Sequence, residues 1–182
     1  MQDRIFTARA VITPLAPGDA PALSAYYLRN AAHLAPWEPL RPEGYHDPAA
    51  WQGRVAEQLA EVAEGRAFRH VARRPGQEEI LSVINLTNVV RGVFQACSLG
   101  YSIDAAAQGQ GLMAEVLAPL IDRLFAVEGL HRVMANYMPS NTRSGRVLQR
   151  LGFEEEGRAR DYLMIAGRWE DHVLTARIAP PR

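Results

Sequence analysis

Residues 101–113 read Tyr101-Ser102-Ile103-Asp104-Ala105-Ala106-Ala107-Gln108-Gly109-Gln110-Gly111-Leu112-Met113. The residues before Asp104 favour a strand, and the apolar spacing after Gly111 predicts a helix, so a glycine-bearing turn joins the two. Glycine lets a ligand approach the backbone, and the N–H groups of residues 107–112 can point to one spot at the helix N-terminus. Such a spot suits a phosphate or pyrophosphate, although a strand-to-helix turn without a ligand has the same spacing.

Two other nucleotide-binding patterns fit this stretch badly. The Walker loop requires Gly-Lys-Ser/Thr, and the sequence contains no lysine. The dinucleotide fingerprint expects a third glycine at position 114, where Ala114 stands, and an all-parallel strand-helix-strand unit.

The predicted elements on either side define the fold class. Strands are expected at 7–15, 67–73, 80–90, 94–104 and 131–138, and a final pair of strands is expected after Phe153 with its turn at Ala166-Gly167. Helices are expected from Asp19, at 47–65, at 112–129 and at 141–151. A meander followed by strand-helix-strand predicts an α/β (α+β) fold with one mixed, mostly antiparallel sheet flanked by helices on both faces. Pro119 lies inside the third predicted helix, which is a local conflict.

Composition bounds the class of protein. The 182 residues suit one domain spanning 1–182, with 48% apolar and 22% charged residues. The net charge is zero, so direct nucleic-acid binding is not expected, and all 20 basic residues are arginine. A single cysteine, Cys97, and the absence of a long apolar run or leader predict a cytoplasmic protein without a membrane partner, as a monomer or homodimer.

A second polar motif follows the predicted strand at 131–138. Asn141 can cap the next helix, and Ser144 lies one turn further on nearly the same face. Taken singly, the asparagine can be a cap only, and the serine a solvated helix residue.

Together these motifs resemble the GNAT superfamily of N-acetyltransferases: Gln108-Gly109-Gln110-Gly111 after a strand, then Asn141-x-x-Ser144 and Leu151-Gly152-Phe153. Ala106 stands where that family's loop usually carries its first polar residue. The resemblance extends to the RimJ/RimL group, and within it to the RimJ type that acetylates alanine at ribosomal-protein N-termini. It rests on residues 36–39, 88–92, 95–103, 131–139, 161–163 and 169–176.

The resemblance implies acetyl-CoA as co-substrate and no metal. The pyrophosphate would lie on the loop 107–112, and the pantetheine arm along the strand before it, in a gap where that strand splays from 131–138. The implied cofactor-binding residues are Tyr101, Ser102, Ile103, Ala107, Gln108, Gly109, Gln110, Gly111, Leu112, Asn141 and Ser144.

The implied reaction is acetyl transfer to the N-terminal α-amine of a protein, an alanine-starting protein of the small ribosomal subunit. An α-amine has a pKa of ~7.7–8.0, so it needs little help from a base, and direct attack without a covalent enzyme intermediate is expected. Cys97 is expected to be buried rather than nucleophilic. The catalytic candidates are Ser144, Glu38 and Asp161, and the substrate-binding candidates are Trp37, Glu38, Tyr137 and Tyr162.

Two other functions stay open from the sequence. The acceptor could be a small-molecule amine, or the chain could be a non-catalytic acyl-CoA-binding or ribosome-assembly protein. The five histidines show no metal-ligand spacing.

Overall fold

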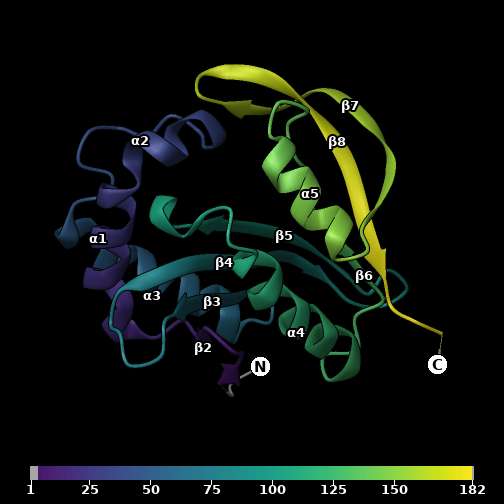
Figure 1. Cartoon of the computed structure of the whole chain (residues 1–182), viewed down its shortest axis with the longest axis horizontal. Helices are drawn as coiled ribbons and strands as arrows, with labels where there is room; N and C mark the ends of the chain where they lie inside the picture. The colour runs from purple at the N-terminus through teal and green to yellow at the C-terminus, as the bar shows by residue number, and fades with distance from the viewer. Residues whose placement is uncertain (1–3, 182) are drawn as a thin grey trace.

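The computed structural model describes residues 4–181, whose strands form one eight-stranded sheet (Figure 1). The strands are β1 (Ile5–Phe6), β2 (Val11–Pro14), β3 (Phe68–Arg73), β4 (Ile80–Val90), β5 (Ala96–Ile103), β6 (Arg132–Met134), β7 (Glu154–Ile165) and β8 (Arg168–Ile178). The helices are α1 (Ala20–Arg29), α2 (Ala31–Leu34), α3 (Pro48–Ala63), α4 (Leu112–Ala126) and α5 (Thr142–Arg150).

The sheet order is β1-β2-β3-β4-β5-β6-β8-β7. Strands β5 and β6 are parallel, and the other neighbouring pairs in the described part of the chain are antiparallel. Parallel neighbours need a crossover connection, and here α4 makes it. The predicted mixed, mostly antiparallel sheet is therefore confirmed.

Helices cover both faces of the sheet (Figure 1). Ile84 and Leu86 of β4 belong to the core that includes α4 and α5, whereas Val83 belongs to the core beneath α1 and α3. The alternation follows from the two-residue period of a strand. None of the helices in the described residues combines the length and apolar character that a membrane span requires.

The strand predicted over residues 7–15 is wrong in its extent, because only Val11–Pro14 (β2) is strand and residues 7–10 form the turn that joins it to β1. The Thr7 N–H donates to the Ala10 carbonyl over 2.9 Å. The Thr7 hydroxyl donates to Glu115 of α4, which also accepts from the Arg9 amide. These local and side-chain bonds replace the strand ladder at the turn.

Two further predictions needed correction. The strand expected at 131–138 is only Arg132–Met134, because the chain beyond it leaves β5 and bonds to β8. Asp19 does not cap α1; its carboxylate accepts instead from the Ala16 amide and pairs with Arg73.

Helix α4 continues through Pro119, so the conflict seen in the sequence does not end the helix. A proline in a helix interior costs ~3 kcal/mol. The helix buries eight large apolar side chains, each contributing roughly 1.5–3 kcal/mol when fully buried. Burial therefore outweighs the missing backbone hydrogen bond.

Candidate active site

The parallel strands β5 and β6 separate halfway along β5. Their pairing ends at Ser98↔Met134, although β5 continues to Ile103. On the other side, the amides of Ala135 and Tyr137 donate to carbonyls of β8 over 3.0 and 3.2 Å. The second half of β5 therefore leaves one hydrogen-bonding edge facing a gap in the sheet.

A cavity of about 600 Å³ lies at this gap. Its wall comes from the second half of β5, the loop between β5 and α4, the first residues of α4, one face of α5 and the segment 33–38. The predicted cofactor residues line it except for Gln110, and Trp37, Glu38 and Ser144 line it as well.

The glycine loop presents backbone N–H groups without a hydrogen-bond acceptor in the described residues, and it forms part of the cavity wall. Within the described residues 4–181, the N–H groups of Gly109, Gln110 and Gly111 donate no hydrogen bond. Gly109 and Gly111 have φ values of 73° and 75°, which residues with a side chain rarely adopt. These amides lie beside the N-terminus of α4, so they make a site for an anion.

Fewer loop amides are free than predicted, because the first two donate within the protein. The Ala107 amide donates to the Asp104 carbonyl over 2.9 Å, and the Gln108 amide donates to the Ala105 carbonyl over 3.4 Å. The side chain of Gln110 points back to the Ala106 carbonyl, which explains why it does not line the cavity.

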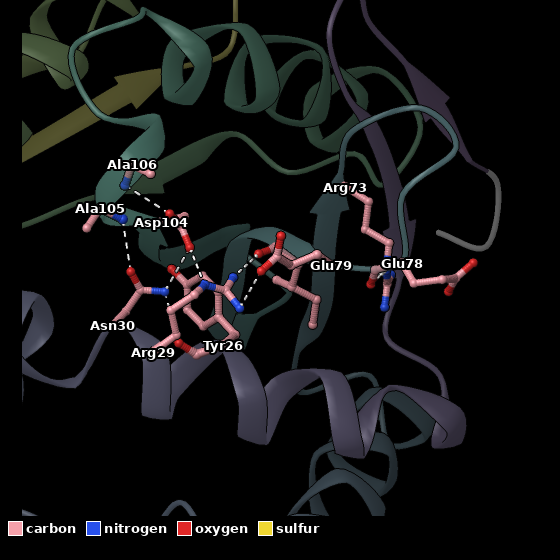
Figure 2. A network of polar contacts seen from close by, with 10 residues as sticks. Tyr26, Arg29, Asn30, Arg73, Glu78, Glu79, Asp104, Ala105 and Ala106 are labelled. Carbon is pink, nitrogen blue, oxygen red and sulfur yellow. Dashed lines mark hydrogen bonds and ion pairs between the residues drawn. The ribbon is translucent and has the colours of Figure 1, made fainter.

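Helix α1 holds the start of this loop in place (Figure 2). Asp104 accepts from the Ala106 amide over 2.9 Å and from Arg29 over 2.7 Å. Asn30 accepts from the Ala105 amide over 2.9 Å and donates to Asp104 over 3.1 Å. Burial alone would raise the pKa of Asp104, but these hydrogen bonds hold it below its usual value.

Sequence reasoning missed Arg29 and Asn30, which lie about 75 residues before the loop. The structure breaks the helix between α1 and α2 at Asn30, a buried polar residue, and this break was not expected from the sequence. A buried amide side chain requires partners, but the sequence does not say which ones.

Two hydroxyl groups meet across the gap. The Tyr101 Oη of β5 lies 2.7 Å from the Ser144 Oγ of α5, and either can be the donor. Burial raises the pKa of Tyr101 to about 12, so this hydroxyl keeps its proton at neutral pH. The Ser144 amide donates to Asn141 over 3.1 Å, which confirms the predicted helix cap.

Glu38 supplies the cavity with a carboxylate. Burial raises its pKa, and the positive charge of Arg41 opposes the rise. Its carbonyl accepts from the Ala166 amide over 2.9 Å, which joins this segment to the turn between β7 and β8. A half-buried carboxylate with a raised pKa is suited to accept a proton near neutral pH.

The structure does not bring three predicted residues to this cavity. Asp161 is exposed at a bulge in β7, with a φ of 46°, and Tyr162 is exposed beside it and accepts from Asn136. Tyr137 lines a second cavity of about 420 Å³ on the other side of α5. Its ring packs against Gly145, where a Cβ atom would come within 2.9 Å of it.

Cys97 lies in the interior of β5 and is fully buried. Burial raises the pKa of its thiol to about 12, so the thiol remains protonated. Among the residues described, no three His, Cys, Asp or Glu side chains gather in an arrangement that could hold a metal ion.

Comparisons with known proteins agree with this geometry. Residues 9–154 match the family model for an acetyltransferase (GNAT) domain. The chain is 48% identical to the [ribosomal protein uS5]-alanine N-acetyltransferase of Escherichia coli, covering 97% of this chain and 91% of that protein.

Two solved structures share the fold over nearly their whole length. The ribosomal-protein-S5-alanine acetyltransferase of Vibrio fischeri has a TM-score of 0.93 and 35% identity, covering 98% of this chain and 97% of that one. RimJ of Mycobacterium smegmatis in complex with CoA-disulfide has a TM-score of 0.92 and 30% identity, covering 98% of this chain and 90% of that one. The chain therefore belongs to the GNAT acetyltransferase family, as an acetyl-CoA-dependent N-acetyltransferase of the RimJ/RimL group.

Proposed function

We propose that this enzyme acetylates the N-terminal α-amine of ribosomal protein uS5, at an N-terminal alanine. The observation that carries the proposal is the 48% identity, over 97% of the chain, to an enzyme named for that reaction. We also propose that residues 1–182 act as one N-acetyltransferase domain in the cytoplasm, where a ribosomal-protein substrate is found.

The coenzyme would be held by main-chain groups. The amides of Gly109, Gln110 and Gly111 are free to bind its pyrophosphate, and the open edge of β5 is free to bind its pantetheine arm. Asn141 lines the cavity beside them, with its side-chain oxygen engaged in the helix cap. Acetyl-CoA supplies the activated acetyl group, and the chain's own residues orient it and manage two protons.

The first proton comes from the acceptor amine. An α-amine with a pKa of ~7.7–8.0 is partly neutral at physiological pH, so a modest base is sufficient. We assign this role to Glu38, because among the described residues that line the cavity it is the one with a carboxylate. Asp161 remains a predicted alternative for binding the ammonium group of the substrate.

The second proton goes to the departing sulfur. A thiol of ordinary reactivity has a pKa of ~8.5, so a hydrogen-bond donor helps it to leave. Ser144 is assigned as that donor, with Tyr101 as the hydroxyl that orients and resupplies it through their 2.7 Å contact. Cys97 is fully buried away from the cavity, which supports direct transfer without an acetyl-cysteine intermediate.

The remaining alternatives receive less support. The likeness to spermidine N-acetyltransferases is at 16–17% identity and shows the fold alone. A non-catalytic coenzyme binder would not need the Tyr101–Ser144 pair beside a carboxylate in one cavity.

Mass spectrometry of acceptors incubated with acetyl-CoA tests the proposal. A uS5 N-terminal peptide starting with alanine should gain one acetyl group at its α-amine, and the same peptide with a blocked N-terminus should gain none. Spermidine and a serine-starting peptide serve as competing acceptors. Acetylation of spermidine alone, or release of no free coenzyme A with any acceptor, would contradict the proposed function.

A further inference from the structure

Helix α5 carries three arginines on the wall of the cavity. Arg143, Arg146 and Arg150 are spaced by three and four residues, so they share one face of the helix. All three line the cavity and are exposed. We call them the arginine face.

The charges of the arginine face are not neutralised by the protein. None of the three makes an ion pair with a carboxylate within residues 4–181, and α5 contains no acidic residue. Several other arginines of the chain do have carboxylate partners, among them Arg29, Arg69, Arg73, Arg132 and Arg177.

Its placement is also unfavourable for the helix itself. Arg143 stands in the first turn of α5, where the positive end of the helix dipole disfavours a cation. Arg146 and Arg150 are like charges four residues apart, which destabilises a helix. Arg150, in the last turn, is favourably placed for the dipole, so the unfavourable placements are those of Arg143 and of the Arg146–Arg150 pair. Charges that cost helix stability and have no carboxylate partner point to an absent anion.

The arginine face borders the free amides of the glycine loop. A Cβ atom on Gly111 would lie 3.4 Å from the Arg150 Nη1, so this guanidinium reaches the loop. Arg143 donates to the side-chain oxygen of Gln108, whose Nε2 lies 2.7 Å from the His33 ring. The arginine face therefore lies at the end of the cavity where the loop amides would bind a phosphate, whereas Glu38 lies in the segment after α2.

We propose that Arg143, Arg146 and Arg150 bind the 3′-phosphate of coenzyme A and make the enzyme select coenzyme A over its dephosphorylated form. The inference rests on the coenzyme site of the proposed function. The loop amides offer donors for the pyrophosphate, and the arginine face adds positive charge beside them for the other anion of this ligand, a phosphomonoester with a charge of about −1.5 to −2 at pH 7. Guanidinium groups match phosphate oxygens through paired hydrogen bonds.

Isothermal titration of coenzyme A and 3′-dephospho-coenzyme A tests this assignment. The wild-type protein should bind coenzyme A at least about tenfold more tightly, since a hydrogen bond to a charged group contributes about that factor. The triple variant Arg143→Gln, Arg146→Gln, Arg150→Gln should bind the two ligands with nearly equal affinity, and its affinity for the dephosphorylated form should be unchanged.

Arg158→Gln is the matched control, because Arg158 is an exposed arginine of β7 that does not line the cavity. It should keep the wild-type preference. Thermal unfolding shows whether the triple variant is folded, and unpaired arginines predict an equal or higher Tm. Equal affinities in the wild type, or an equal loss for both ligands in the variant, would overturn the assignment. If the wild type binds neither ligand, the coenzyme site of the proposed function is itself wrong.

Discussion

Tyr101 and Ser144 show how burial changes the use of an ordinary side chain. The tyrosine lies in the sheet, burial raises its pKa further above neutral pH, and its hydroxyl lies 2.7 Å from that of the serine. A serine alone is a weak acid. A serine backed by a second hydroxyl can donate to sulfur while it accepts a hydrogen bond.

Ser144→Ala is expected to lower kcat about 100-fold, because general acid assistance is worth roughly 10²–10⁴. Tyr101→Phe should lower kcat less, since the serine remains. The KM for acetyl-CoA should change little in both variants. Steady-state kinetics with Ser98→Ala, at the paired end of the same strand, provides the control. An unchanged kcat in Ser144→Ala would remove the serine from the mechanism.

Glu38 predicts the pH dependence of the reaction. Its pKa is raised by burial, and a general base works only above its pKa, so its contribution is lost as pH falls through that value. The neutral fraction of the substrate amine falls with pH as well. Below the pKa of Glu38, the slope of log(kcat/KM) against pH should therefore be two in the wild type and one in Glu38→Gln.

The rate near neutral pH should drop about tenfold in Glu38→Gln, less than the roughly 10²–10⁴ of a full general base, because the α-amine is already partly neutral. Glu43→Gln, at an exposed carboxylate five residues after Glu38, should leave both the slope and the rate at wild-type values. If Glu38→Gln keeps the steeper slope, the base lies elsewhere, and Asp161 is the next candidate to replace.

At the scale of elements, the glycine loop is held from both sides. Asn30 and Arg29 fix its first residues through Asp104, and α4 follows directly after Gly111. The free amides are therefore oriented before any ligand arrives. Preorganised donors of this kind lose little entropy on binding.

Gly109→Ala is expected to raise the KM for acetyl-CoA, because alanine strains a backbone with φ of 73° by ~1–2 kcal/mol and shifts the loop amides. A Cβ atom there meets nothing within 4 Å, so the effect comes from φ and not from a clash. Gly65→Ala is the matched control, with φ of 71° and equally open space at the end of α3.

Both glycine variants should lose a similar amount of stability in chemical denaturation. Only Gly109→Ala should change the KM for acetyl-CoA. Equal KM values in the two variants would show that the loop does not bind the coenzyme.

At the scale of the whole molecule, His70 makes folding sensitive to acid. It is buried in β3, and both ring nitrogens lack a hydrogen-bond partner among the described residues. Burial, with Arg123 adding to it, lowers its pKa to about 3. The unfolded chain has a histidine pKa of ~6.5, so below that pH the unfolded state binds the extra proton.

The contribution of neutral His70 to the free energy of unfolding should therefore be at its maximum above about pH 6.5. Below that pH it should fall by ~1.4 kcal/mol per pH unit, down to about pH 3. His70→Met should remove most of this loss, which urea denaturation at pH 7.5 and pH 5 can measure. His131→Gln, an exposed histidine, should retain the wild-type loss. The same loss in His70→Met would show that other groups cause the acid sensitivity.

Local pattern was sufficient for the elements and for the glycine loop. Strand periodicity, helix spacing and two glycines are properties of neighbouring residues, so β4, β5, α4 and the cap at Asn141 followed from them. The splay of β5 from β6 came from the family resemblance and not from spacing. The predicted extent of the N-terminal strand was wrong because side-chain hydrogen bonds form a turn there. The predicted length of β6 was wrong because the chain beyond Met134 pairs with β8 instead of β5.

The sequence by itself determined the fold class and the glycine-loop residues that can bind an anion, because both depend on short-range order, and its resemblance to known sequences determined the family. Tertiary structure alone decided which distant side chains share a cavity: Glu38 with Ser144, Asn30 with the loop, and the arginine face with Gly111. It also left Asp161 and Tyr162 outside that cavity. Contacts between residues so distant in the sequence depend on how the layers pack, and no local periodicity records that packing.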